Sequence, residues 1–405
     1  MSLSRYRELL SIPAVPGLLA ASVPARAFTG MTNLAMLLLV TQHHGYDVAG
    51  LVTGCSAIGS VLAGPAVAKL ADRVGRRLVL LIGSVGYSAT LVLLTILPPE
   101  PLALMAVAAL GGAFTPPVLA ALRAALAALT SPQQRLTAFS LDSTLQEIVL
   151  VTGPMFTTLL VALASPSAAL IGSGVLTLVG TLLFCGQRAA EAGRSARTAR
   201  PTRTERGRSR SRLAGPGFVM MLAAASALLA GLVVVNLAAV AGAGGPDAPT
   251  ASAIMLACVA AGSGVGGLVF GARAKGDTAL ALFPGGVAVG AVLLALAPGI
   301  GILAVLLFLF GTMVAPALTM LYDGITRRAS PSRATEAYAW LASATGVGGA
   351  LGNIVGGSVV EHLGPSTGFL VAAALLGTCA VICLLPVLRR PGVGPEPSSS
   401  EPAYR

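Results

Sequence analysis

Long apolar segments alternate with short polar ones along the whole chain. The apolar runs are near ~20 residues long, which is the length that a helix needs to cross the hydrocarbon core of a bilayer. We therefore predict an all-α membrane protein with twelve transmembrane helices. The helices are expected at roughly 15–40, 48–68, 78–97, 102–128, 137–163, 167–186, 215–242, 249–272, 278–297, 300–326, 333–360 and 365–388.

Two polar segments divide this pattern. Residues 187–214 are rich in Arg, Ser, Thr and Gly, and they are too polar and too like-charged to form a packed core. The chain end after residue 388 is rich in Pro and Ser. The predicted domains are accordingly a first six-helix bundle at 1–186, a cytoplasmic Arg-rich linker at 187–214, a second six-helix bundle at 215–388 and a disordered cytoplasmic tail at 389–405.

Composition supports a membrane protein. Of the 405 residues, 55% are hydrophobic and only 10% are charged, whereas soluble domains carry about 25% charged residues. The first residues lack a small-residue cleavage site after a short apolar core, so we expect the first helix to be a retained span. All five cysteines fall within predicted spans, which argues against disulfide bonds and against a zinc site. We expect no metal.

The basic residues occur on one side of the predicted layout. Alternate loops carry Lys and Arg, and the loops between them carry none. The positive-inside rule then places both termini and the linker in the cytoplasm. This placement accounts for the net charge of +11 without a nucleic-acid partner. Arg outnumbers Lys, and the chain is rich in Ala and Gly, which indicates a GC-rich bacterial genome and hence the bacterial inner membrane.

The two halves of the chain repeat each other. A shift of about 200 residues brings small residues and prolines into register, as expected for a transporter built from two related halves. The matched positions include Gly112 with Gly311, Pro117 with Pro316, Gly153 with Gly352, and Cys55 with Cys258. We therefore predict two homologous six-helix bundles related by a pseudo-two-fold axis.

One charged stretch, KLADRVGRRLVL at 69–80, lies between two long apolar segments and reads as a tight loop at a membrane face. It contains Asp72, Arg73, Gly75, Arg76 and Arg77. This order resembles the loop signature between helices 2 and 3 of the major facilitator superfamily. The superfamily pattern opens with Gly where this chain has Ala68, a mild departure because Ala is also small.

The resemblance implies a function for this stretch and for the two halves. Superfamily members place a central cavity between two bundles and open it alternately to each side of the membrane. In the superfamily the Asp of the charged loop faces the start of helix 11 and steadies the outward-open state. The resemblance assigns Asp72 this role and makes the loop as a whole a gating element.

Four charged residues lie inside predicted spans: Arg26, Arg123, Asp142 and Glu147. A charge at a helix centre costs at least about 2.5–3.5 kcal/mol, so each is a functional candidate. Depth along the helices matches Glu147 with Arg26, and Asp142 with Arg123. Two neutral pairs could lock the first bundle, the arginines could bind an anionic substrate, or Glu147 could carry a proton.

Comparison with proton-coupled antiporters of the superfamily gives partial matches. Arg123 matches an Arg on helix 4 of these antiporters, but their Arg-x-x-Gln-Gly pattern is absent. The Gly153-Pro154 pair resembles part of a glycine-rich pattern of drug exporters, and here the glycines after Pro are missing. A simple proline kink explains Pro154 equally.

Polar and aromatic residues within the spans are candidate cavity contacts, with packing as the alternative at each position. They are Phe28, Asn33, Asn236, Tyr322 and Trp340.

The sequence as a whole predicts a secondary active transporter. The leading hypothesis is a proton-coupled exporter of a small organic molecule, and the alternative is an importer or facilitator of a small anionic metabolite. A transporter-like sensor or scaffold is the alternative from a different class. No phosphate-binding glycine loop and no catalytic set is present, so we expect no enzyme and no cofactor beyond a proton gradient. The expected partners are a small-molecule substrate and the lipid bilayer, and we expect a monomer.

Overall fold

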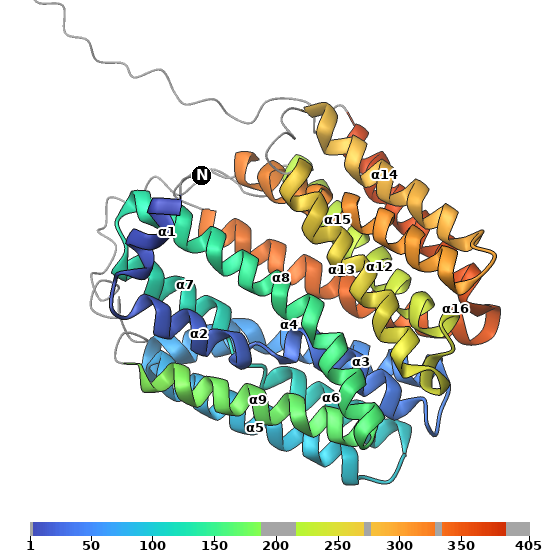
Figure 1. The fold of residues 1–405 in the computed structure, drawn as a ribbon, viewed down its shortest axis with the longest axis horizontal. Helices are drawn as coiled ribbons and strands as arrows, with labels where there is room; N and C mark the ends of the chain where they lie inside the picture. Colours follow the sequence, from blue (N-terminus) through green and yellow to red (C-terminus); the bar gives the residue numbers. More distant parts are fainter. Residues whose placement is uncertain (1–2, 188–215, 271–276, 329–333, 386–405) are drawn as a thin grey trace, which may run out of the picture.

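The computed structural model describes residues 3–187, 216–270, 277–328 and 334–385, which form helices and the turns between them. The predicted linker at 187–214 and the tail at 389–405 lie almost wholly outside these ranges. The elements, drawn in Figure 1, are α1 (Leu3–Leu10), α2 (Val15–Ala25), α3 (Phe28–Val40), α4 (Tyr46–Val74), α5 (Arg76–Ile96), α6 (Pro101–Ala113), α7 (Val118–Leu129), α8 (Pro132–Leu163), α9 (Pro166–Gly186), α12 (Pro216–Gly242), the 3₁₀ turn η2 (Gly245–Asp247), α13 (Pro249–Phe270), α14 (Asp277–Ala295), α15 (Ile300–Arg328) and α16 (Ala334–Leu384).

The all-α prediction is confirmed for the described residues. They contain nine stretches that are long and apolar enough to cross a membrane, and two shorter apolar helices, Ile148–Leu163 and Leu282–Ala295. One of the nine, Trp340–Leu384, has 45 residues and is interrupted by Gly364, whose φ of 81° is not helical. The two helices predicted at 333–360 and 365–388 meet at this glycine.

Two of the predicted spans are broken helices in the structure, whereas the sequence predicts continuous ones. The span predicted at 15–40 consists of α2 and α3, and Arg26 and Ala27 lie between them. Pro24 lies in the last turn of α2, where its ring cannot continue the regular hydrogen-bond ladder. The span predicted at 102–128 consists of α6 and α7, which are separated by Phe114–Pro117.

The charged stretch at 69–80 is shorter as a loop than the sequence suggested. Helix α4 continues to Val74 and α5 begins at Arg76, so Gly75 alone separates them. Gly75 has φ 102° and ψ 146°, a region of backbone space that is essentially restricted to glycine. A glycine at this position therefore permits the reversal between the two helices.

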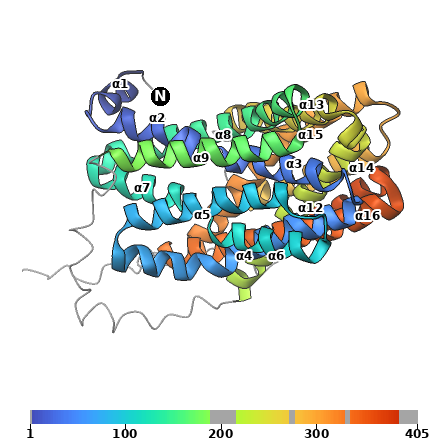
Figure 2. The same ribbon diagram turned by 90° about the horizontal axis from the view of Figure 1, so that it is seen from below.

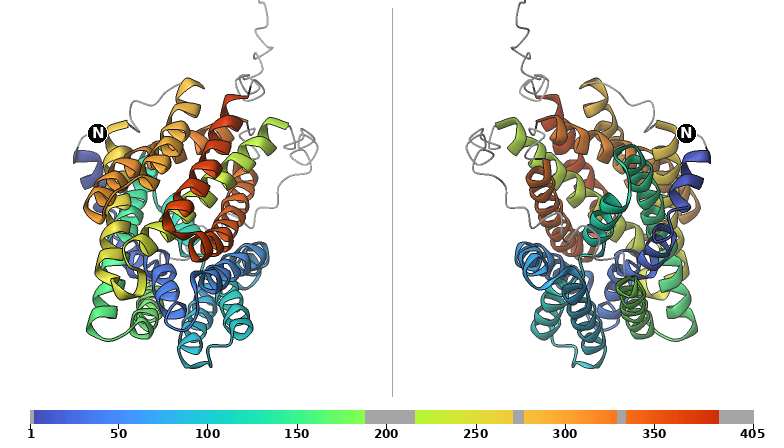
Figure 3. Two further views of the ribbon diagram at one scale, coloured as in Figure 1. Left: turned by 90° about the vertical axis from the view of Figure 1, so that its right-hand side faces the viewer. Right: turned by 90° about the vertical axis from the view of Figure 1, so that its left-hand side faces the viewer.

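The helices run side by side in two groups (Figures 1 and 2). One buried cluster is formed by α12–α16 and includes Met221, Leu307 and Leu376. Two others are formed mainly by α1–α9. Figure 3 shows the blue and cyan helices of the first group below the orange and red helices of the second. The groups meet where α4 packs against α16 and α8 packs against α13.

Candidate functional site

A buried charge network lies at the break between α2 and α3. Nη1 of Arg26 donates to Oδ1 of Asp142 at 2.7 Å, and Nε of Arg123 donates to Oδ2 of the same carboxylate at 3.0 Å. Arg26 is 1% exposed and Asp142 is fully buried, whereas Arg123 is 46% exposed. Two arginines on α7 and at the helix break therefore share one carboxylate of α8.

The local structure of the break orients Arg26. Its Nε donates to the carbonyl oxygen of Ser22 at 3.2 Å, and its Nη2 donates to Oγ of Ser22 at 3.1 Å. The guanidinium is thus held on three sides by Ser22 and Asp142. Arg123 lies over the ring of Phe139, 5.9 Å from its centroid, which adds a cation–π contact.

The predicted pairing of Asp142 with Arg123 agrees with the structure. Arg26 also bonds Asp142, whereas the sequence analysis matched it in depth with Glu147. The side chain of Glu147 lies outside the part of the chain that the structure describes. Its pairing with Arg26 and its role as a proton carrier stay predictions.

A cavity of about 270 Å³ lies between the two groups of helices. Its wall is formed by α3, α4 and α8 from the first group and by α12, α13, α15 and α16 from the second. Most of the wall is apolar, with Leu34, Leu37 and Leu237 among the larger side chains. None of the described residues that line it carries a charge.

The polar groups of the cavity wall fall into two kinds. The hydroxyl of Thr29 donates to the Arg26 carbonyl oxygen at the helix break, that of Thr53 donates to a carbonyl oxygen of its own helix, and Nδ2 of Asn353 donates to the Gly349 carbonyl oxygen at 3.1 Å. Asn33 of α3 and Asn236 of α12 are exposed to the cavity, and within the described residues no hydrogen bond is assigned to either amide. The hydroxyl of Ser263 also lines the cavity without an assigned hydrogen bond within the described residues, so these three side chains are available to a ligand.

Thr29 connects the cavity to the charge network. Its hydroxyl donates to the carbonyl oxygen of Arg26 at 2.8 Å and accepts a hydrogen bond from Nε2 of Gln146 at 3.1 Å. Arg26 itself does not line the cavity. A change in the network can consequently reach a cavity residue through the α3 backbone.

The two groups of helices contact each other at one end of the molecule, which we call the closed end and define by Tyr46, Pro249 and Glu361. There, Oε2 of Glu361 on α16 accepts a hydrogen bond from the backbone N–H of Tyr46 at 2.6 Å, at the first turn of α4. On the other flank, the hydroxyl of Thr158 on α8 is 3.4 Å from the carbonyl oxygen of Pro249 on α13.

Glycines allow close contact between α4 and α16 near the closed end. A Cβ at Gly50 would lie 2.3 Å from the Asn353 carbonyl oxygen, and one at Gly357 would lie 2.3 Å from the Tyr46 carbonyl oxygen. The contact between the two helices continues as far as Val61, because a Cβ at Gly346 would lie 2.2 Å from Cγ2 of Val61, whereas a Cβ at Gly64 would meet nothing within 4 Å. α4 and α16 thus pack closely from the closed end as far as Val61.

Comparison with known proteins identifies the family. A profile of the Major Facilitator Superfamily matches residues 18–322, about three quarters of the chain. The chain belongs to the Major Facilitator Superfamily. No curated protein matches it in sequence.

Solved structures share the fold. A crystal structure of the nucleoside transporter NupG has a TM-score of 0.70 at 18% identity, and the match covers 92% of this chain and 98% of that chain. A mutant form of the same transporter has a TM-score of 0.69 at 17% identity, with 92% and 99% covered. At these identities the likeness concerns the fold alone. The superfamily match and the apolar helices make this chain a multi-pass membrane transporter of a small molecule, not an enzyme.

The gating residues that the superfamily signature indicated lie around Gly75. Arg73 is in the last turn of α4 and exposed, and Arg76 and Arg77 begin α5. The side chain of Asp72 lies outside the described part, so its contact with the start of helix 11 stays a prediction.

The other candidates are placed as follows. Phe28 is half-buried and packs edge-to-face on Tyr87, with ring centroids 5.5 Å apart, and it does not line the cavity. Trp340 is 54% exposed and also lies away from the cavity wall. The side chain of Tyr322 lies outside the described residues.

Some residues of the cavity wall and of the closed end were not among the candidates predicted from the sequence. Asn353 and Ser263 line the cavity, and Glu361 bonds across the closed end. A polar residue inside the glycine-rich stretch of α16 was a usable signal for Asn353. Nothing in the sequence near Glu361 distinguishes it from a solvated loop residue.

Proposed function

We propose that this protein is a secondary active transporter that moves a small, uncharged organic molecule across the membrane by alternating access. The proposal rests on the cavity between the two groups of helices. Asn33 and Asn236 each offer it a donor and an acceptor, Ser263 adds a hydroxyl, and the other polar side chains of the described wall are already hydrogen-bonded. Such a site suits a ligand with polar groups at its edges and an apolar surface between them.

The proposed architecture has twelve spans in two related bundles, with the bundle, linker and tail boundaries given above. It is supported by the positions of the cavity residues. The shift that brings Cys55 onto Cys258 also brings Asn33 onto Asn236 and Leu34 onto Leu237, and all four of these last residues line the cavity. A ligand at this place would touch corresponding positions of both bundles.

The proposed direction is export, driven by the proton gradient, with both termini in the cytoplasm of a bacterial cell and the protein acting as a monomer. The positive charge of the loops supports this orientation. In this proposal the closed end faces outward and the cavity opens to the cytoplasm. Glu147 is the proposed proton carrier because it is an acidic residue within a span.

A second candidate is an importer or facilitator of a small anionic metabolite. The observation that favours it is the 46% exposure of Arg123, whose guanidinium carries positive charge toward the open end. Against it, Arg26 is buried and bonded to Asp142, so its charge is not offered to a ligand in this state.

A thermal-shift experiment tests the substrate class. The purified protein would be incubated with uridine and hypoxanthine as uncharged compounds, uridine monophosphate as an anion and ethidium as a lipophilic cation. A compound present at about 100 times its dissociation constant adds about 2.7 kcal/mol of stability. We expect uncharged compounds to stabilise the wild type but neither Asn33→Leu nor Asn236→Leu.

The control is Thr53→Val, which removes a cavity hydroxyl that already bonds its own helix. It should keep the response of the wild type. Stabilisation by the anion alone, lost in Arg123→Ala and kept in both Asn variants, would replace the proposal with the second candidate.

Proteoliposomes test coupling. Efflux of a radiolabelled ligand found in the thermal-shift panel should require an imposed pH gradient in the wild type. Glu147→Gln should still exchange ligand across equal concentrations but lose the response to the gradient. Unchanged gradient-driven transport in Glu147→Gln would exclude Glu147 as the carrier.

A further inference from the structure

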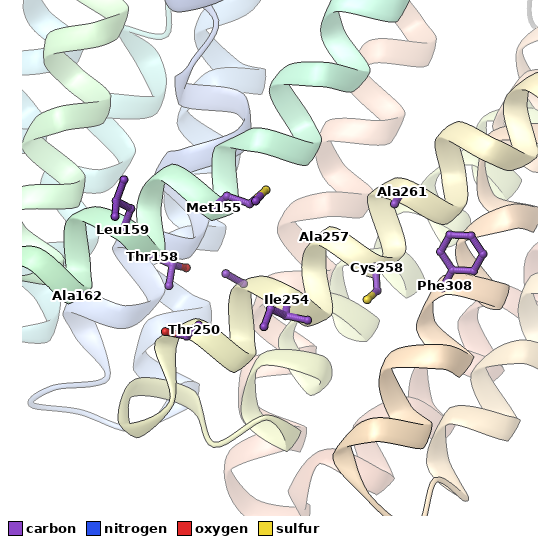
Figure 4. Close-up of a pocket in the computed structure, with 11 residues that line it drawn as sticks. Met155, Thr158, Leu159, Ala162, Thr250, Ile254, Ala257, Cys258, Ala261 and Phe308 are labelled. Carbon is purple, nitrogen blue, oxygen red and sulfur yellow. The ribbon is translucent and has the colours of Figure 1, made fainter.

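A second hollow, separate from the central cavity, lies on the flank of the molecule where α8 meets α13. It has a volume of about 500 Å³ and is lined from α8 by Met155, Thr158, Leu159 and Ala162, and from α13 and α15 by residues that include Ile254, Cys258 and Phe308. Figure 4 shows these side chains on both walls of the gap between the two helices. We call this hollow the flank groove.

The shape of the flank groove follows from the sizes of its residues. Alanines form its floor on α13, at positions 253, 257 and 261, while Met155, Leu159 and Ile254 form its rim. These three rim residues are 56%, 51% and 51% exposed. Large exposed apolar side chains beside a shallow alanine floor make a trough that is open on the outside of the helix bundle.

The chemistry of the flank groove is apolar. Among the described residues that line it there is no charge, and its polar atoms belong to two threonines and Cys258. The hydroxyl of Thr158 already donates to the Pro154 carbonyl oxygen at 2.9 Å. A hollow with so few free hydrogen-bonding groups is a poor site for ordered water.

The position of the flank groove restricts its occupant. It lies on a membrane transporter, between helices whose apolar stretches face the hydrocarbon region. An α-helix is about 10–12 Å wide, so two turns of a neighbouring helix would require roughly 1,000 Å³, about twice the volume of the groove. A hydrocarbon chain is much narrower than a helix and fits a trough of this volume.

We propose that the flank groove binds an acyl chain of a membrane phospholipid. The acyl chain would lie between α8 and α13 and contact both groups of helices, next to the contact between Thr158 and Pro249. An opening of the closed end separates α8 from α13 and removes one wall of the groove. A bound chain therefore stabilises the state described here.

A photoreactive lipid tests the site. The full-length protein would be placed in nanodiscs of phosphatidylglycerol and phosphatidylethanolamine that contain a phosphatidylcholine with a diazirine in its acyl chain. After illumination and digestion, mass spectrometry locates the adducts. We expect the adducts to concentrate at least fivefold on groove residues of α8 and α13 over equally exposed residues such as Val289 of α14, which is 61% exposed.

Two groove-filling variants provide the matched comparison. Ala257→Trp fills the floor, and Ala261→Trp places the same side chain at a more exposed floor position, which is less demanding for folding. Both should lose the groove adducts. Ala374→Trp, at an exposed position of α16 outside the groove, should keep them.

Added phospholipid should also raise the midpoint of thermal unfolding of delipidated wild type and Ala374→Trp more than that of Ala261→Trp. Adducts spread in proportion to exposed area, or an equal rise in all variants, would overturn the proposal. An absence of adducts at the groove beside normal labelling of Val289 would show that no acyl chain occupies it and would also overturn the proposal.

Discussion

The sharing of Asp142 by two arginines determines what each arginine can do. Arg26 and Asp142 are both buried, and each needs the other to remain charged in an apolar environment. Arg123 is half-exposed, so water can solvate its charge if the carboxylate is lost. The guanidinium of Arg26 therefore has a structural role at the helix break, whereas the guanidinium of Arg123 on α7 is accessible to solvent.

Arg26→Ala should lower the free energy of unfolding by about 3–5 kcal/mol, because it leaves a carboxylate buried with only a half-exposed partner. Denaturant titration in detergent micelles measures the change. Arg123→Ala should cost clearly less.

The double variant Arg26→Met, Asp142→Leu is the control for this prediction. It removes both buried charges together and should be more stable than Arg26→Ala. If Arg26→Ala unfolds within about 1 kcal/mol of the wild type, the pair does not hold the break in α2–α3 together.

Residue depth could be predicted from the sequence, but the direction of a side chain could not. Counting along the helices placed Asp142 and Arg123 at one level, and they are hydrogen-bonded. The same count could not show that the break at Arg26 directs its guanidinium to Asp142. Asn33 and Asn236 stood out as amides in apolar spans, whereas Asn353 and Thr53 line the cavity because of how α4 and α16 pack.

At the scale of elements, α4 and α16 form the tightest connection between the two groups of helices. Gly50 and Gly357 allow the backbones of α4 and α16 to approach each other closely. The carboxylate of Glu361 accepts a hydrogen bond from the first backbone N–H of α4. A carboxylate at a helix N-terminus is favoured by the helix dipole. The contact between α4 and α16 at the closed end thus depends on two features, the glycines at the interface and the hydrogen bond that Glu361 accepts.

Gly357→Leu should force the closed end apart, because its Cβ alone would lie 2.3 Å from the Tyr46 carbonyl oxygen. The measurement is the distance between spin labels on cysteines at His43 and His362, two exposed positions of this end, in a background without native cysteines. We expect the distribution to shift to longer distances.

Gly349→Leu is the matched control on the same helix, since a Cβ there would meet nothing within 4 Å. It should keep the wild-type distribution. Equal distance distributions in Gly349→Leu and Gly357→Leu would show that the α4–α16 interface accommodates a larger side chain. The glycine at 357 would then not determine whether the closed end stays closed.

The apolar pattern predicted which segments form helices better than where each helix ends. Polar residues remain in regular helices at a membrane face, so α4 extends through Lys69 and Arg73 to Val74. A charged run is also typical of a loop, and the helix end predicted at 68 rests on that signal. The break at Phe114–Pro117 contains two adjacent prolines. It was not predicted because the apolar pattern continues on both sides of them.

At the scale of the whole molecule, the orientation in the membrane relates the described state to a direction of transport. The described turn at Gly75, which carries Arg73, Arg76 and Arg77, lies at the end of α4 opposite the closed end. If the positive loops are cytoplasmic, the open end faces the cytoplasm.

Labelling of single cysteines in intact bacterial cells tests this orientation. In a background without native cysteines, His362→Cys should react with a membrane-impermeant maleimide in intact cells. Arg77→Cys should react only after the cells are permeabilised. The reverse pattern would invert the orientation and with it the side to which the cavity opens.

The charge network would make the transport cycle sensitive to voltage if the cycle moved it through the membrane field. The three side chains of Arg26, Arg123 and Asp142 together carry one net positive charge within the apolar spans. One elementary charge that crosses the full membrane potential gains or loses about 2.3 kcal/mol per 100 mV. A conformational change that carries the network through a third of that field therefore changes the balance of states by roughly 0.8 kcal/mol per 100 mV. With such a movement, the electrical gradient of a respiring cell would act on the transport cycle even when the substrate has no charge.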